Sequence, residues 1–62
     1  MTAEESLERA EQLLARVEGV RARLEQTEDA EITTELLAEL VDLVREVQAQ
    51  IEQAKREVDA QP

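Results

Sequence analysis

The fold is decided by the stretch Glu25-Gln26-Thr27-Glu28-Asp29-Ala30-Glu31-Ile32-Thr33-Thr34-Glu35, in which only Ala30 and Ile32 are apolar. On both sides of it, apolar residues recur at alternating intervals of three and four, which is the heptad pattern of a coiled-coil helix. The heptad phase slips by two residues across the stretch, from positions 7, 14 and 21 to positions 37, 44 and 51. Known interruptions of a continuous coiled coil insert three or four residues. We therefore predict two helices, near 3–26 and 31–59, with a turn near 27–30.

Capping signals stand at both predicted helix starts. Thr2 and Glu5 fit the T-x-x-E capping box, in which the threonine caps the helix and the glutamate reaches back to it. Asp29 or Thr27 is suited to cap the second helix. These signals support the two helix boundaries that the periodicity predicts.

The apolar positions predict how the two helices pair. The first helix carries Leu7, Ala10, Leu14, Val17 and Leu24, with Arg21 in the one gap, and the second carries Leu37, Leu40, Val44, Val47, Ile51, Ala54 and Val58. Each position of the first set meets one of the second when the two numbers sum to 61, and the centre of this pairing falls in the polar stretch. Residues 1–62 are therefore expected to form one all-α domain, an antiparallel two-helix hairpin that resembles a coiled coil.

A second group of apolar residues flanks this predicted seam and suggests an interface. Its members are Leu13, Val20, Leu36, Val41 and Leu43. The chain has only sixteen Leu, Ile and Val residues, and so small a core leaves a single hairpin marginally stable. We expect the group to contact a second copy in a four-helix bundle dimer, or a larger partner. The alternative is one wide apolar stripe on each helix, with no interface role.

Composition argues against catalysis and against several ligand classes. The chain has no His, Cys, Phe, Tyr or Trp, and its net charge is −9. The usual general base and the thiolate metal ligands are therefore absent, and we expect no catalytic residue, cofactor or metal. The acidic balance disfavours nucleic acids and anionic membranes as direct partners. The start Met1-Thr2-Ala3-Glu4-Glu5 is unlike a signal peptide, so the expected location is cytoplasmic.

Two carboxylate groupings keep a remote catalytic alternative open. The chain reads E-E-x-x-E at residues 4–8 and E-x-x-D at residues 39–42, and together these are similar to the metal-binding signature of all-helical, Mg²⁺-dependent nucleotide pyrophosphohydrolases. In the predicted pairing Glu8 and Glu39 lie about fourteen residues, or ~21 Å, apart along the helices. One hairpin is therefore not expected to assemble that site.

The sequence also resembles the small subunit of exodeoxyribonuclease VII over residues 10–58. The second helix of that family carries a run of the form A-R-x-C-Q-x-x-L-x-x-A-x-x-x-V, which is matched here by Arg45, Gln48, Ala54 and Val58, with Ile51 at the leucine position. The first helix of the family is matched by Leu14, Val17, Glu18, Val20, Leu24 and Glu25. The family's turn contains a glycine, whereas residues 26–34 here contain none.

The resemblance implies a non-catalytic subunit that binds the large subunit of a nuclease, which would supply the metal and the DNA contacts. The alternative is a stand-alone oligomerisation or adaptor hairpin, natural or designed, with no link to a nuclease. Both interpretations predict a helical protein–protein interaction module that binds itself, a larger protein, or both.

Overall fold

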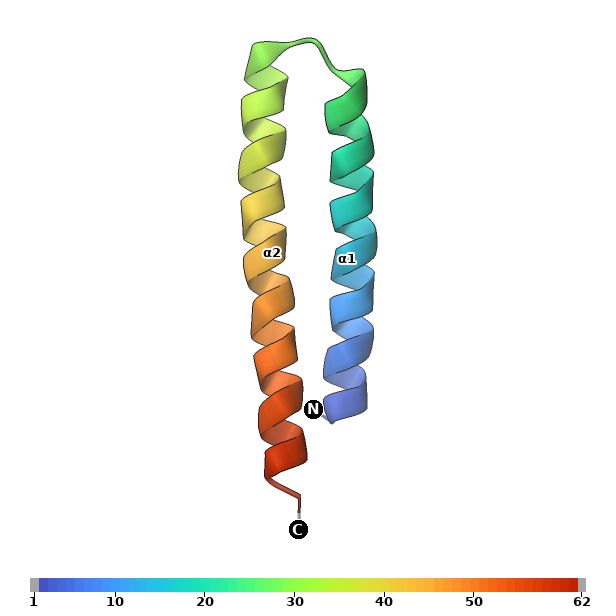
Figure 1. Ribbon diagram of the computed structural model, residues 1–62, viewed down its shortest axis with the longest axis vertical. Helices are drawn as coiled ribbons and strands as arrows, with labels where there is room; N and C mark the ends of the chain where they lie inside the picture. The colour runs from blue at the N-terminus through green and yellow to red at the C-terminus, as the bar shows by residue number, and fades with distance from the viewer. Residues whose placement is uncertain (1, 62) are drawn as a thin grey trace.

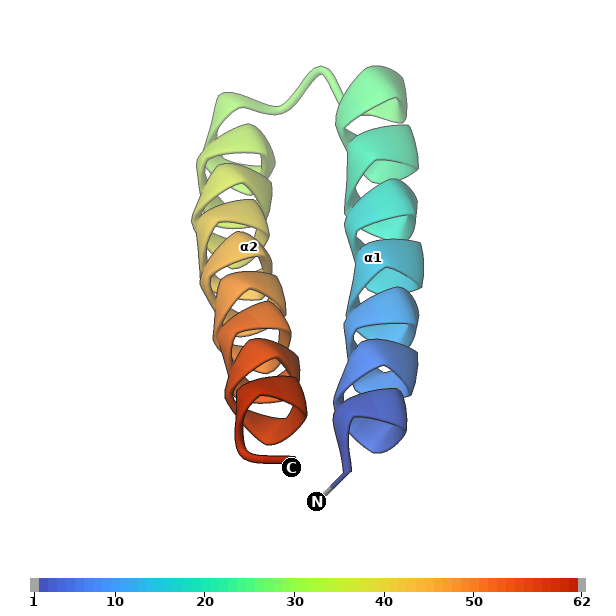
Figure 2. The ribbon, with the colours of Figure 1, turned by 60° about the horizontal axis from the view of Figure 1, so that its bottom comes forward.

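The computed structural model describes residues 2–61 and shows two long helices that lie side by side in opposite directions (Figure 1). Helix α1 spans Ala3–Gln26 and helix α2 spans Ala30–Asp59. The hairpin measures 52 × 14 × 12 Å, and Figure 2 shows the helices adjacent along their whole shared length. This confirms the all-α hairpin, and each helix begins and ends within one residue of its predicted boundaries.

Helix α1 begins with the capping box that the sequence predicts. The backbone N–H of Glu5 donates to the Thr2 hydroxyl at 3.1 Å, and the Thr2 N–H donates to the Glu5 carboxylate at 3.0 Å. These two bonds satisfy donors that the first helical turn leaves without a partner.

The turn between the helices consists of Thr27, Glu28 and Asp29 and needs no glycine. No residue in the described part of the chain has a positive φ, so ordinary residues fit the turn without strain. Asp29 is the N-cap of α2, and its carboxylate accepts from the N–H groups of Glu31 and Ile32 at 2.8 and 3.1 Å. Thr27 is the C-cap of α1, and its hydroxyl accepts a hydrogen bond from the backbone N–H of Asp29.

One row of buried and half-buried positions on each helix forms the contact between the helices. On α1 the row runs through residues 3, 6, 10, 13, 17, 20 and 24 and continues to Thr27 in the turn, and on α2 it runs through residues 33, 36, 40, 43, 47, 50, 54 and 57. The intervals alternate three and four on both helices, and the positions pair one to one when their numbers sum to 60. The register is therefore shifted by one residue from the predicted sum of 61. We call these two rows the inner seam.

The core lies in the half of the inner seam nearer the turn. It is built from Leu13, Val20, Leu36, Leu43 and Val47, with Val17, Leu24 and Leu40 packed against them. The predicted seam was wrong in half of its positions. Ala10, Val17, Leu24, Leu40, Val47 and Ala54 face inward as expected, whereas Leu7, Leu14, Leu37, Val44, Ile51 and Val58 are exposed.

The charge on Arg21 gives a physical reason for this choice of seam. A seam through Leu7 and Leu14 continues through Arg21, which would bring a guanidinium group into the contact between the helices. Taking an unpaired charge out of water carries a large free-energy penalty. The observed seam has Val20 at that level instead and leaves Arg21 in solvent.

Candidate protein–protein interface

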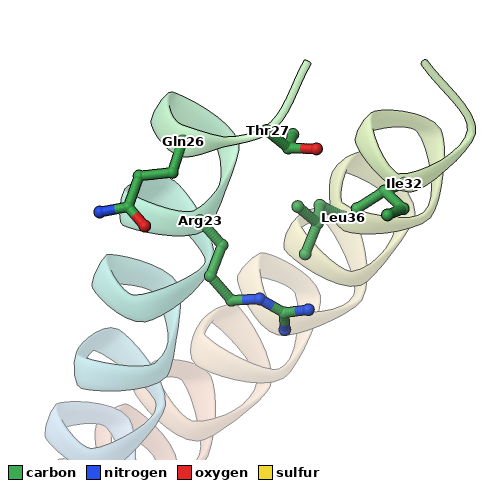
Figure 3. A pocket seen from close by; sticks show the side chains of 5 residues that line it. All are labelled: Arg23, Gln26, Thr27, Ile32 and Leu36. Atoms are coloured by element: carbon green, nitrogen blue, oxygen red, sulfur yellow. The ribbon is translucent and has the colours of Figure 1, made fainter. Parts of the chain in front are cut away.

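One side of the hairpin is lined by charged side chains. Arg9 and Arg16 of α1 line one shallow hollow together with Glu46 of α2. Nearer the turn, Arg23 lines a second hollow with Ile32 and Leu36, and its side chain extends toward α2 (Figure 3). Arginines at positions 9, 16 and 23 therefore lie along one side of the inner seam, next to the corresponding row of α2.

The opposite side of the inner seam is apolar and exposed. On both helices, the residues that directly follow an inner-seam residue in the sequence lie on this side, because each residue advances about 100° around a helix. They include six large apolar side chains that are 47–58% exposed, namely Leu7, Leu14, Leu37, Val44, Ile51 and Val58. We call these six residues the outer apolar face. A continuous exposed apolar surface on a small protein is typical of an interaction site.

Helix α2 carries this surface as a complete second seam. Its members are Leu37, Val41, Val44, Gln48, Ile51, Lys55 and Val58, and their intervals alternate four and three. All seven are exposed. Because a seam with this spacing packs against a parallel or antiparallel neighbouring helix, α2 has the pattern of a helix with two helical neighbours, of which α1 is one.

Helix α1 borders the outer apolar face with acidic residues. Glu4, Glu11, Glu18 and Glu25 follow one another at intervals of seven on the solvent side of Leu7 and Leu14. The corresponding row on α2 contains Thr34, Val41, Gln48 and Lys55 and has no acidic residue. The two edges of the face therefore differ in charge.

Arg21 continues the row of Leu7 and Leu14 on α1, next to the outer apolar face, and is paired within its own helix. Its guanidinium donates to the carboxylates of Glu18 and Glu25, with the Glu18 ion pair at 3.0 Å. The hydrogen bond and the charge of Glu18, followed by the charge of Glu25, raise the pKa of Arg21 above its ordinary value. The two ion pairs neutralise part of the acidic edge.

The interface predicted from the sequence contained the wrong apolar row. Leu13, Val20, Leu36 and Leu43 are only 3–7% exposed and form the core of the hairpin, so they are unavailable to a partner while it is folded. Val41 is the one predicted interface residue that is exposed, at 50%. The six residues of the outer apolar face were assigned to the intramolecular seam, so the sequence interpretation exchanged the two surfaces.

Two polar residues lie in the contact between the helices at the open end of the hairpin. Ser6 is completely buried, and its hydroxyl oxygen has no hydrogen-bond partner among residues 2–61. The side-chain carbonyl oxygen of Gln50 is also buried, and no described residue donates a hydrogen bond to it. Both residues stand on the inner seam, where Ser6 pairs with Ala54 and Gln50 with Ala10. The open end of the seam therefore has small and polar layers, in contrast to the leucine-rich layers near the turn.

The carboxylate groupings at residues 4–8 and 39–42 are not brought together. Within residues 2–61 there is no group of three or more His, Cys, Asp or Glu side chains that is arranged to hold a metal ion. Neither helix, over the same residues, combines the length and the apolar content needed to cross a bilayer.

The comparisons with known proteins assign no family to this chain. No family model, curated protein or solved structure matches it.

Proposed function

We propose that this chain is a non-catalytic interaction subunit, a helical hairpin that binds another helical protein through its outer apolar face. The observation that carries the proposal is the complete second seam of α2, which is exposed along its length from Leu37 to Val58. These residues span 21 intervals, or ~31 Å of helix. A surface of this shape fits an α-helix better than a small ligand, which binds in a concave pocket.

The charge of the chain also favours protein as the partner. A net charge of −9 opposes binding to the phosphate backbone of nucleic acids. The arginines at positions 9, 16 and 23 lie on the other side of the inner seam, where Glu46 stands beside Arg9 and Arg16. The apolar and charged surfaces are thus separate, and the apolar one is the proposed docking surface.

The resemblance over residues 10–58 makes the large subunit of an exodeoxyribonuclease VII the first larger partner to test. Of the residues that carry this resemblance, Leu14, Ile51 and Val58 lie on the outer apolar face, whereas Val17, Val20, Leu24 and Ala54 lie on the inner seam. A partner of this class would contact Leu14, Ile51 and Val58 and supply the catalytic machinery.

Co-purification tests the proposal. A tagged and an untagged copy of the chain are expressed together in the source cell, with any exodeoxyribonuclease VII large subunit of that cell, and the retained proteins are identified. We expect the tagged chain to retain at least one of the untagged copy and the large subunit, and Val44→Glu to abolish retention. Retention of neither protein by the unmodified chain would refute the proposed function.

A further inference from the structure

We infer that the occupant of the outer apolar face is a second copy of this chain, which packs by two-fold symmetry to form a four-helix bundle. In this bundle α1 of each copy lies against α2 of the other, and both turns are at the same end. The inference rests on the proposed function and names the partner of the same surface.

The angle between the two seams of α2 fits such a bundle. The inner seam and the outer seam of α2 differ by one sequence position, which corresponds to about 100° around the helix axis. In a square arrangement of four helices, each helix has two nearest neighbours at about 90° to one another. The outer apolar face of one hairpin therefore points toward the positions that the third and fourth helices of a bundle occupy.

The area of the face is also that of a specific dimer. The hairpin measures 52 × 14 × 12 Å, so one of its long sides has a projected area of roughly 700 Å², close to the area that each partner contributes to a stable interface. Two copies face to face would bury about 1,400 Å² in total, within the ~1,200–2,000 Å² of stable protein–protein interfaces. A second hairpin covers the outer apolar face along its full length.

Charge selects one of the two symmetric ways to pack two copies. When the two-fold axis runs parallel to the helices, α1 lies on α2 of the second copy at the same height. The acidic row of α1 then faces the row that contains Gln48 and Lys55, with Glu4 beside Lys55 and Glu11 beside Gln48 of the second copy. When the axis runs across the helices, α1 lies on α1, and the two acidic rows of residues 4, 11, 18 and 25 face each other. Repulsion between like charges disfavours this second packing.

This self-complementarity distinguishes a second copy from an unrelated partner. The outer face has one acidic edge, on α1, and one edge without acidic residues that carries Lys55, on α2. The parallel two-fold axis places each edge against the other kind. A uniformly basic partner would match only the edge formed by α1.

Sedimentation equilibrium of the purified full chain measures the association directly. We expect a mass of twice 7.0 kDa at high concentration, with a shift toward dimer as added salt screens the net charge of −9 on each copy. Val44→Glu introduces a charge at the centre of the face, and Ala38→Glu introduces the same charge on an exposed position of α2 that points away from the face. Val44→Glu should weaken association at least ~30-fold, as expected of a central interface residue, whereas Ala38→Glu should leave it nearly unchanged.

Crosslinking tests the arrangement without altering the six apolar residues. Chains with the single substitution Glu11→Cys are mixed with chains that carry Gln48→Cys and treated with a short bis-maleimide crosslinker. Because each chain has one thiol, any crosslink joins two copies. We expect the mixed Glu11→Cys and Gln48→Cys product to predominate. A predominant product between two Gln48→Cys chains, or between Glu11→Cys and Glu18→Cys chains, would overturn the arrangement.

A 7.0 kDa mass at every concentration, or a dimer that Val44→Glu leaves intact while circular dichroism shows full helicity, would overturn the second-copy inference. Retention of the large subunit by the tagged chain would in that case still support the proposed function. The two failures are therefore distinguishable.

Discussion

Leu36 and Leu37 give the sharpest test of which surface is core, because they are neighbouring leucines in the same helix. Leu36 is 3% exposed and Leu37 is 49% exposed. Leu36→Ala removes a fully packed side chain and should lower the free energy of unfolding by ~2–5 kcal/mol. Leu37→Ala removes a side chain that is about half buried, so it should lower it by only ~1 kcal/mol. The same change in helix propensity applies to both.

Urea unfolding followed by circular dichroism measures the two losses. A 62-residue chain has a total stability of only about 3–9 kcal/mol, so Leu36→Ala is expected to remove a large fraction of the stability while Leu37→Ala removes little of it. The loss caused by Leu37→Ala should grow with protein concentration as the second copy covers that residue. Leu13 and Leu14, which are 7% and 50% exposed, form an independent matched pair on α1. Equal losses within each pair at the lowest concentration would refute the inner seam described above.

Ser6→Ala should stabilise the hairpin by about 1 kcal/mol, because it removes a buried hydroxyl that has no hydrogen-bond partner in the described part of the chain, and the melting temperature should rise by about 4–8 °C. Gly19→Ala should also stabilise by about 1 kcal/mol, since the added methyl group meets open space; a drop in melting temperature for either variant would contradict this account. Hydrogen bonds from the Thr2 backbone N–H and then the Thr2 hydroxyl lower the pKa of Glu5 below 4.5, so its stabilising effect is present above the unfolded-state pKa and disappears as the pH falls through the lower folded-state value. An acid titration of helicity should therefore show a smaller loss over this range for Glu5→Gln than for the unmodified chain. Incubation with Mg²⁺ or Mn²⁺ and a panel of nucleoside triphosphates should give no turnover, and turnover that Glu39→Gln abolishes would show the interaction function to be wrong.

The sequence determines the two helices and the turn through local interactions. Thr2, Glu5 and Asp29 form their capping hydrogen bonds with residues two or three positions away, so those bonds can be predicted from sequence spacing alone. The slip of the heptad phase likewise depends only on residue order. On α1, Ala10, Val17 and Leu24 belong both to the predicted seam and to the observed inner seam. The prediction that they face α2 was therefore correct.

The tertiary structure alone decides which neighbouring row completes that seam. Two sets of residues alternate with Ala10, Val17 and Leu24 at intervals of three and four. One set contains Leu13 and Val20, and the other contains Leu14 and Arg21. Periodicity therefore favours the two sets equally. Only the packing of both helices distinguishes them. The observed seam excludes Arg21 and its two ion pairs from the contact and accepts Ser6 and Gln50, whose burial as neutral groups costs less free energy than that of a charge. This choice makes Leu13, Val20, Leu36 and Leu43 the core and leaves the outer apolar face exposed.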